Sequence, residues 1–261
     1  IMNSYETLKL YGHTDSFSEL KNLYDGSCFP SKILFTGKKG IGKSTTAYHL
    51  INYIFSIKES HPYDFKNFKI DNLNKSFKLI QNNSHPNFFH IGLKGEKKNI
   101  DINQVREMYD FVNKSSFYNK NKIVLIDDAE FLNKSSSNAL LKIIEEPNAN
   151  LYFILILDNE KYISETLKSR CIEYKFKNNF ETTELIVNNF FNENKMSSIS
   201  TNIKHDSLTA GFYIEIIEFL DTHKFNSNEI SVKDLILFMM QKKLYKDSFL
   251  RKNLFLIIQL Y

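Results

Sequence analysis

The sequence predicts an α/β domain built on a parallel sheet of five strands, followed by an all-α part. Three observations lead to this fold class. Short apolar segments alternate with helix-compatible segments up to about residue 178, which is typical of a parallel sheet covered by helices on both faces. A glycine-rich loop joins the first of these strands to a long helix. Strand patterns fade after residue 178, whereas helical patterns continue.

The strands are expected where short, mainly apolar segments are bounded by polar or turn residues. These segments are residues 32–36, 87–91, 122–126, 152–157 and 172–175. Helices are expected between the strands, at residues 43–57, 102–113 and 135–144. Pro147 ends the last of these helices, because proline cannot continue a helix.

Two further segments lie outside this alternation. Residues 1–30 are predicted as a helical lead-in with a turn at Asp25-Gly26. Residues 59–83 are rich in Lys and Asn and have no clear period, so we expect an insertion with a short helix near residues 77–80.

Helical patterns follow the last strand, at residues 180–192, 208–219, 232–242 and 249–261. The chain is therefore expected to divide into an α/β part of residues 1–178, a helical part of residues 179–222, and the start of a further helical part at residues 223–261. Because the last residues are strongly apolar, we expect either a docking helix or the point where a longer chain is cut.

Composition excludes several classes of protein. The chain has 261 residues, of which 42% are hydrophobic, and a net charge of +4 that is too small to predict nucleic-acid binding. No apolar run has the length of a membrane span and no signal-peptide pattern begins the sequence, so a cytoplasmic location without membrane contact is expected. The two cysteines, Cys28 and Cys171, fit a reducing compartment, exclude a four-cysteine zinc module and make zinc unexpected.

The glycine-rich loop follows the pattern G-x-x-x-x-G-K-[ST] without a mismatch. Glycines let backbone N–H groups surround phosphate oxygens, and the start of the next helix adds the positive end of its dipole. Lys43 is expected to reach the β- and γ-phosphates and act in catalysis, while the Ser44 hydroxyl is expected to hold Mg²⁺. The predicted nucleotide-binding residues of this P-loop are Gly37, Lys38, Lys39, Gly40, Ile41, Gly42, Lys43, Ser44 and Thr45.

Two carboxylates, Asp127 and Asp128, follow the apolar strand at residues 122–126. In a parallel sheet the carboxyl end of this strand lies beside the phosphate-binding loop. Asp127 is therefore expected to hold Mg²⁺ together with Ser44. Asp128 is a candidate to orient or deprotonate the attacking water.

Arginine is rare in this lysine-rich chain and occurs at positions 106, 170 and 251. Arg170 lies in a Ser-Arg-Cys segment just before the last predicted strand. At the rim of the sheet its forked guanidinium can act as an arginine finger on a γ-phosphate that a neighbouring subunit binds. A salt-bridging surface arginine is the alternative interpretation.

Together these motifs resemble the clamp-loader subunits of the AAA+ ATPase class, and most closely the delta-prime subunits of bacterial DNA polymerase III. The matching segments are Gly12-His13, residues 37–44, 84–88, 123–130 and 137–147, and Ser169-Arg170-Cys171. The resemblance spans about residues 5–178. It implies an α/β P-loop NTPase domain, a helical lid and the start of a helical collar domain, in the order of the three parts given above.

This resemblance also implies a function and a set of partners. It implies a subunit of a five-membered ring that uses ATP and Mg²⁺ to load a sliding clamp on primed DNA in replication, with gamma/tau and delta subunits as partners. Arg170 would act in trans on the ATP site of a neighbour, and Tyr11 and Gly12 would lie near the adenine. The first sensor would fall at residues 158–159, where we favour Asn159.

The sequence departs from the family pattern at three places. Residues 59–83 contain no cysteine, whereas the gamma/tau relatives carry a zinc module there. Asp128 stands where the family has a longer glutamate, and residues 208–214 lack the arginine of the second sensor. We therefore expect nucleotide binding with slow or absent turnover by this chain alone. The alternatives are a catalytic gamma/tau-like loader subunit and an independent P-loop ATPase or kinase.

Overall fold

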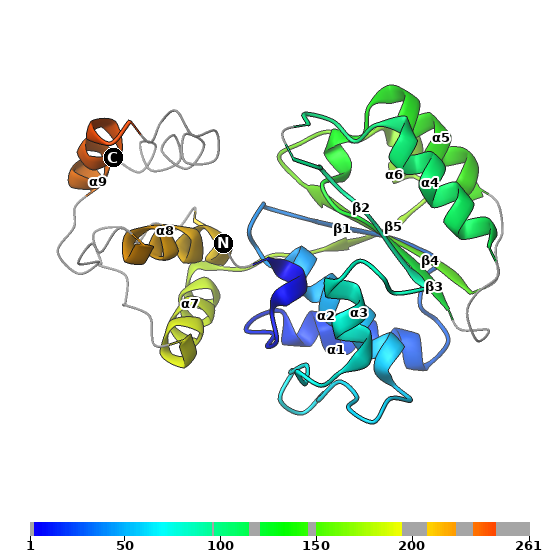
Figure 1. The fold of residues 1–261 in the computed structure, drawn as a ribbon, viewed down its shortest axis with the longest axis horizontal. Coiled ribbons are helices and arrows are strands. Elements are labelled where there is room, and N and C mark those ends of the chain that lie inside the picture. The colour runs from blue at the N-terminus through cyan, green and yellow to red at the C-terminus, as the bar shows by residue number, and fades with distance from the viewer. Residues whose placement is uncertain are drawn as a thin grey trace. The chain divides into compact units, whose positions relative to one another are not determined.

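The computed structural model describes residues 3–95, 97–114, 121–145, 150–194, 208–222 and 232–243. The chain forms two compact units, one of residues 2–177 and the other of residues 178–261. The first unit contains a β-sheet with helices around it, and the described parts of the second are helical (Figure 1).

A parallel sheet is the centre of the first unit. Its five strands are β1 (Lys32–Gly37), β2 (Phe88–Ile91), β3 (Lys122–Ile126), β4 (Leu151–Asp158) and β5 (Ile172–Lys175). They lie in the order β2-β3-β4-β1-β5, with Lys32 of β1 opposite Phe153 of β4. Because all strands run in the same direction, the carboxyl ends of β1, β3 and β4 lie on the same edge of the sheet.

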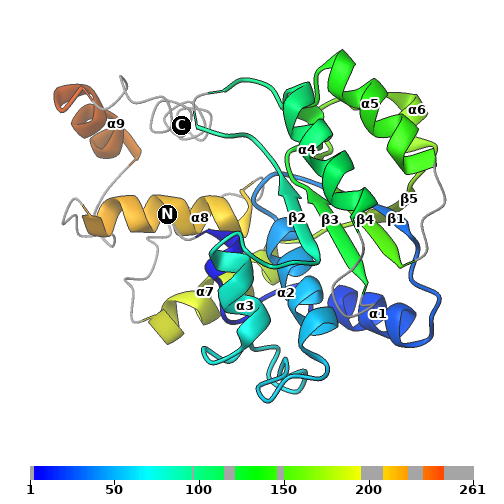
Figure 2. The ribbon, with the colours of Figure 1, turned by 45° about the vertical axis from the view of Figure 1, so that its right-hand side comes forward.

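Helices cover both faces of this sheet (Figures 1 and 2). One face carries α1 (Thr14–Asp25), α2 (Lys43–Ser56) and α3 (Lys75–Gln81), and the other carries α4 (Ile102–Asn113), α5 (Lys134–Glu145) and α6 (Glu165–Lys168). Ile33 and Phe35 of β1 belong to the core with α1–α3, whereas Leu34 between them belongs to the core with α4–α6. This burial on both faces explains why the strand sequences are apolar at nearly every position.

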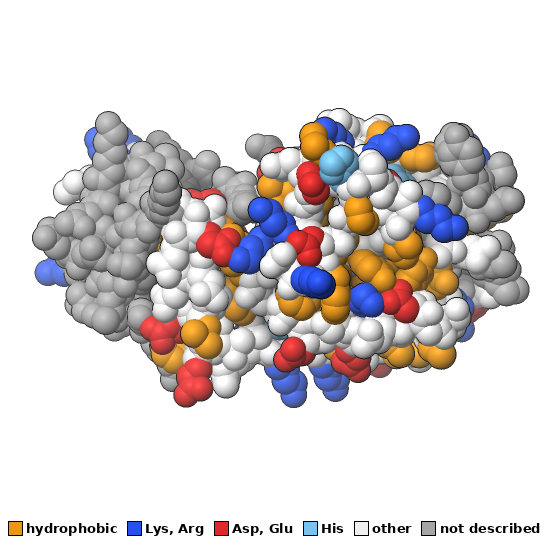
Figure 3. All heavy atoms as spheres, turned by 90° about the horizontal axis from the view of Figure 1, so that it is seen from below, with side chains coloured by type: hydrophobic (Ala, Val, Ile, Leu, Met, Phe, Trp, Pro, Cys, Tyr) orange, Lys and Arg blue, Asp and Glu red, His pale blue; other side chains and the backbone are white. Residues whose placement is uncertain are grey.

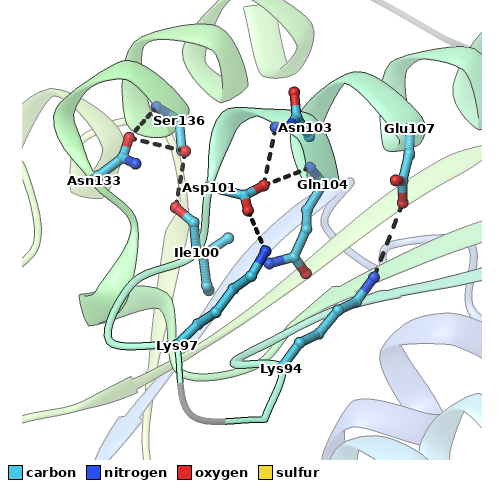
Figure 4. A network of polar contacts seen from close by, with 9 residues as sticks. All are labelled: Lys94, Lys97, Ile100, Asp101, Asn103, Gln104, Glu107, Asn133 and Ser136. Carbon is cyan, nitrogen blue, oxygen red and sulfur yellow. Dashed lines mark hydrogen bonds and ion pairs between the residues drawn. The ribbon is translucent and has the colours of Figure 1, made fainter.

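Polar side chains begin and end α4. The Asp101 carboxylate accepts hydrogen bonds from the backbone N–H groups of Asn103 and Gln104, and it also pairs with Lys97 at 2.7 Å (Figure 4). At the other end, the ammonium of Lys122 donates to the Phe111 carbonyl at 2.7 Å. Both contacts satisfy backbone groups that a helix leaves without intrahelical partners.

The start of α5 is tied to the segment before α4. Asn133 accepts a hydrogen bond from the backbone N–H of Ser136, and the Ser136 hydroxyl donates to the Ile100 carbonyl at 2.9 Å (Figure 4). These contacts hold α4 and α5 on the same face of the sheet.

The insertion at residues 59–83 is held together by hydrogen bonds of buried asparagines. The Asn74 side chain accepts from the backbone N–H of Phe77 at 2.7 Å and from the Asn52 amide at 2.9 Å. Its own amide donates to the His61 carbonyl at 2.7 Å. Within the described ranges, no three His, Cys, Asp or Glu side chains form a group that could hold a metal ion.

The second unit contains α7 (Phe180–Asn194), α8 (Ala210–Thr222) and α9 (Val232–Gln241), and α7 packs against α8. The helix predicted at residues 249–261 lies outside the described residues. None of the helices that the structure describes is long and apolar enough to cross a membrane.

The view in Figure 3 shows acidic and basic side chains intermixed on one face of the molecule.

The architecture confirms the predicted α/β class with its parallel five-stranded sheet, and the described residues after the sheet contain helices, as expected. Strands β3 and β5 and helix α4 have the predicted bounds, and β1, β2 and β4 differ from the prediction only at their ends. The short helix predicted at residues 77–80 falls within α3. The further division of residues 179–261 into a lid and a collar stays a prediction.

Candidate functional site

The P-loop connects β1 to α2, and at two of its glycines a side chain would crowd neighbouring residues. A Cβ atom at Gly37 would lie 2.7 Å from the carbonyl oxygen of Phe176, closer than side chains approach backbone. Gly42 has a φ of +109°, and a Cβ atom there would lie 3.3 Å from the His13 ring. The loop therefore packs so closely against Phe176 and His13 that side chains at these two positions would clash or crowd these neighbours.

Lys43 begins α2 and is buried, with 6% of its surface exposed. Its ammonium donates to the carbonyl oxygens of Gly37 at 2.7 Å and Lys38 at 2.8 Å. Burial lowers the pKa of Lys43, against the opposing influence of the Asp158 and Asp127 carboxylates. The ammonium is thus held inside the loop by neutral acceptors, with carboxylates close by.

Ser44 and Asp127 come together at the carboxyl edge of the sheet. The Ser44 hydroxyl donates to Oδ2 of Asp127 at 2.7 Å. Asp127 follows β3 directly, and its backbone N–H donates to the Ile91 carbonyl at the end of β2 at 2.8 Å. Hydroxyl and carboxylate oxygens are the ligands that Mg²⁺ prefers. The glycine-rich loop, the lysine and this pair of oxygens fit a nucleoside triphosphate bound with Mg²⁺.

His13 supports the P-loop from the side. Its Nε2 lies 2.8 Å from the Ile41 carbonyl, and its ring packs edge-on against Phe176 with 4.9 Å between ring centroids. Burial lowers the pKa of His13, so the neutral ring donates from Nε2 to the carbonyl. Tyr11 and Gly12, predicted near the adenine, directly precede this contact in the chain.

The remaining predicted P-loop residues lie on both sides of this backbone. Ile41 is buried in the core with α1–α3, and Thr45 is half-buried in the first turn of α2. Lys38, Lys39 and Gly40 are exposed. A nucleotide phosphate would therefore meet backbone N–H groups on one side and solvent-exposed lysines at the rim.

Several carboxylates lie near Lys43. Sequence reasoning assigned a role to Asp127 among them, but not to Glu130 or Asp158. Asp127, Asp158 and Glu130 are close enough to influence its charge. Glu130 also accepts a 3.4 Å hydrogen bond from the backbone N–H of Asp158, and burial raises the pKa of Glu130. Asp128 has left-handed backbone dihedrals, with a φ of +54°. Its role in activating water stays a prediction.

The predicted first sensor lies at the end of β4. Asn159 is exposed, and its backbone N–H donates to the Gly37 carbonyl at 3.2 Å. The preceding residue, Asp158, is half-buried, and its negative charge favours the charged form of Lys43. The segment therefore contacts the P-loop, while the choice of Asn159 as sensor stays a prediction.

Sequence reasoning missed His90, which lies on β2 beside Asp127. A Cβ atom at Gly92 would lie 3.2 Å from Nε2 of His90 and 3.9 Å from Cβ of Asp127, so these two side chains border the same space. The His90 Nε2 is buried and has no hydrogen-bond partner among the described residues. A histidine within an otherwise apolar strand is the signal that could have identified it.

Arg170, the predicted finger, lies two residues after α6 and is exposed. Its Nε and Nη2 donate to the same oxygen, Oε1 of Glu145, at 2.7 and 2.6 Å. Its Nη1 donates to the Thr166 carbonyl at 2.8 Å. The structure thus pairs Arg170 with a residue that sequence reasoning noted in the segment 137–147 but gave no role.

Comparison with known sequences identifies relatives in DNA replication. A family model described as "DNA polymerase III, delta subunit" matches residues 12–180. DNA polymerase III subunit delta' of Buchnera aphidicola subsp. Baizongia pistaciae is 30% identical over 209 residues, which are 73% of this chain and 60% of the relative. The subunit delta' of Haemophilus influenzae is 38% identical over 94 residues, which are 36% of this chain and 28% of the relative. The chain thus spans less than two thirds of the length of either relative.

Comparison with solved structures agrees on the fold. The DNA polymerase III gamma subunit-related protein of Thermotoga maritima superposes with a TM-score of 0.50 at 18% identity, covering 94% of this chain and 77% of that one. This likeness supports the α/β fold expected from the sequence and nothing finer. The family match covers more than half of the chain and contains the P-loop, Asp127 and Arg170. The chain therefore belongs to the DNA polymerase III delta subunit family, with relatives named subunit delta'.

Proposed function

We propose that this chain is a clamp-loader subunit that binds ATP with Mg²⁺ at its P-loop and offers Arg170 to a neighbouring subunit. The observation that carries the first part is the convergence of Lys43, Ser44 and Asp127 at one edge of the sheet. Family membership supports the second part, because it relates the chain to subunits of a DNA polymerase.

In this proposal each residue of the site has a simple task. The backbone of the P-loop binds phosphate oxygens, and Lys43 exchanges its carbonyl partners at Gly37 and Lys38 for the β- and γ-phosphates. Ser44 and Asp127 hold Mg²⁺, which would neutralise charge on the phosphates when bound. His13 fixes the loop through the Ile41 carbonyl.

We expect hydrolysis by the isolated chain to be slow. Asp128 has a shorter side chain than the glutamate of the family pattern, and residues 208–222 contain neither Arg nor Lys to serve as a second sensor. Each missing contact removes stabilisation of charge on the transferred phosphate. Brisk ATP hydrolysis by the purified chain would contradict this expectation and favour a catalytic gamma/tau-like loader.

Calorimetric titration with ATP and Mg²⁺ tests the nucleotide site. Lys43→Ala should weaken binding by about tenfold or more, because a hydrogen bond to a charged group contributes roughly 1.5–3 kcal/mol. Lys58→Ala is the control, since Lys58 is exposed and follows the end of α2 that lies away from the loop. Equal affinities of the Lys43→Ala variant and the unaltered chain would reject the proposed site.

The proposed partners are gamma/tau and delta subunits, with the sliding clamp and primed DNA contacted through the complex. Such a role in replication would place the chain in the cytoplasm. Reconstitution with the gamma/tau and delta subunits of the same organism tests it. Arg170→Ala should lower clamp loading and ATP hydrolysis by the complex while the ATP affinity of the isolated chain stays unchanged. A parallel loss of affinity in the isolated chain would indicate action in cis.

A further inference from the structure

The guanidinium of Arg170 is fixed by two acceptors of this chain. Oε1 of Glu145 takes one N–H from Nε and one from Nη2, and the Thr166 carbonyl takes one from Nη1. A guanidinium has five N–H donors in a rigid plane. Because three are used, one N–H on each terminal nitrogen has no partner among the residues that the structure describes.

Both residues of this ion pair lie close in sequence to residues that are buried in the core. Glu145 is the last residue of α5, directly after Ile144, which is fully buried. Arg170 follows α6, whose Leu167 is also fully buried. The hydroxyls of Ser137 and Ser164 lie 3.3 Å apart and link the two helices. The backbone positions of Glu145 and Arg170 are therefore fixed by buried neighbours, although both side chains are partly exposed.

We infer that Glu145 is a positioning residue for Arg170. It orients the guanidinium so that the remaining N–H on each terminal nitrogen is available to an anionic oxygen. A phosphoryl group is the chemical class that suits such a planar, forked donor. This inference rests on the proposed function, in which the anion is the terminal phosphate of a nucleotide bound to a neighbouring subunit.

Glu145 could also act in the opposite sense, by competing with that phosphate for Arg170. Two observations favour positioning. The carboxylate bonds the edge formed by Nε and Nη2 through a single oxygen, so the phosphate does not need to displace it. In addition, exposed ion pairs are weak, at about 0–1 kcal/mol, so Glu145 fixes a direction without strongly sequestering the charge.

The test uses the reconstituted complex with four single variants of this chain and the Glu145→Ala/Arg170→Ala double variant. Arg170→Ala removes the guanidinium, and Glu145→Ala removes the carboxylate that orients it. Glu145→Gln keeps an oxygen acceptor but removes the negative charge. The fourth variant, Glu165→Gln, is the control, because Glu165 is an exposed carboxylate on α6 near Arg170 in sequence. The measurements are kcat and KM for ATP of the complex, and the ATP affinity of each isolated variant.

Positioning predicts a defined pattern. Glu145→Ala lowers kcat by about three- to tenfold with KM unchanged. The transition state loses roughly the stabilisation of one well-oriented hydrogen bond from the charged guanidinium. Glu145→Gln stays within about twofold of the unaltered complex, and so does Glu165→Gln. The Glu145→Ala/Arg170→Ala double variant is no slower than Arg170→Ala alone, since the two residues act through one group. ATP affinity of the isolated chain does not change.

Two other results would overturn the inference, and they differ from each other. If Arg170→Ala lowers kcat while Glu145→Ala leaves it unchanged or raises it, positioning is wrong but the trans role of Arg170 stands. If Arg170→Ala itself has no effect on the complex, both the trans role and its support by Glu145 are rejected.

Discussion

The hydroxyl of Ser44 donates a 2.7 Å hydrogen bond to the carboxylate of Asp127, a residue 83 positions later in the chain. Ser44 lies in the first turn of α2 and Asp127 lies just after β3. The sheet brings these two carboxyl-edge positions together, so the contact depends on the order of the strands rather than on local sequence. It places two oxygen ligands of the kind that Mg²⁺ prefers next to the phosphate-binding loop.

The Asp127→Asn variant should therefore lose most of the magnesium-dependent part of ATP binding. An amide is neutral and a poorer ligand for Mg²⁺ than a carboxylate, so we expect the Kd with Mg²⁺ to rise about tenfold. Binding measured in EDTA should change much less. Calorimetry under both conditions gives the comparison, with Asp128→Asn as the control expected to retain the magnesium dependence. A similar loss in both variants would contradict a special role of Asp127.

Substitution of Gly37 by alanine should disturb the P-loop more than substitution of Gly95. Both residues have positive φ, but a Cβ atom at Gly37 would lie 2.7 Å from the Phe176 carbonyl and one at Gly95 would meet nothing within 4 Å. The left-handed dihedrals of Gly95, with a φ of +59°, cost about 1–2 kcal/mol for alanine. Gly37→Ala should exceed that cost in chemical denaturation and also reduce ATP affinity. Equal destabilisation by the two variants would mean that the clash is relieved.

The two cysteines should differ strongly in reactivity. Cys28 is exposed, whereas Cys171 is half-buried and burial raises its pKa to about 11. Because the thiolate is the reacting species, Cys171 should be alkylated slowly at pH 8. Mass spectrometry after iodoacetamide treatment should find one rapidly modified thiol, and the Cys28→Ser variant should lose that fast phase. Rapid labelling of Cys171 in the folded variant would contradict the burial.

His49 should make the protein less stable in acid. It is fully buried next to the Tyr63 hydroxyl at 2.9 Å, and burial lowers its pKa from the ordinary 6.5 to about 3. Between these two values the unfolded chain binds a proton that the folded chain does not. The free energy of unfolding should therefore fall as the pH drops from 6.5 toward 3, by up to about 1.4 kcal/mol per pH unit for this proton.

Urea titrations at several pH values measure this slope. The variant His49→Gln should have a shallower dependence, whereas His61→Gln should keep it, because the side chain of His61 is 40% exposed and lies near the Asp71 carboxylate. An unchanged slope in His49→Gln would assign the acid sensitivity to other groups.

The asparagine network in the insertion should be important for stability. Asn74 is fully buried and its side chain makes hydrogen bonds to Asn52, Phe77 and His61. Asn74→Ala should cost about 2–4 kcal/mol, because it removes a helix cap and leaves the buried Asn52 amide without this partner. The exposed Asn82→Ala is the control. Thermal unfolding with and without EDTA should give the same Tm, and a drop in EDTA would contradict a metal-free insertion.

Most of the fold was predictable because it has local signals. The strands are short apolar segments, and the P-loop fixes the connection from β1 to α2. No local sequence pattern indicates the order of the strands in the sheet. That β1 lies between β4 and β5 follows from packing of the whole unit, and no strand order was predicted.

The site was predictable to the extent that its residues carry motifs. Lys43, Ser44 and Asp127 meet as their motifs suggest. His13, His90 and Glu145 were given no role, because their significance depends on partners that are distant in sequence. A single glutamate at the end of a helix, for example, is normally solvated, and only the position of Arg170 makes Glu145 a candidate for function.

The position of β1 also has a consequence for synthesis of the protein on the ribosome. β1 pairs with β4 and β5 and with no other strand of the sheet, so Lys32–Gly37 has no strand partner until residues 151–158 have been made. Contacts of such long sequence separation form late and slowly. The nascent chain must therefore carry an unpaired apolar strand, followed by an unsupported P-loop, through much of its translation. The growing chain would acquire the proposed nucleotide site only after β4 has been inserted between β3 and β1.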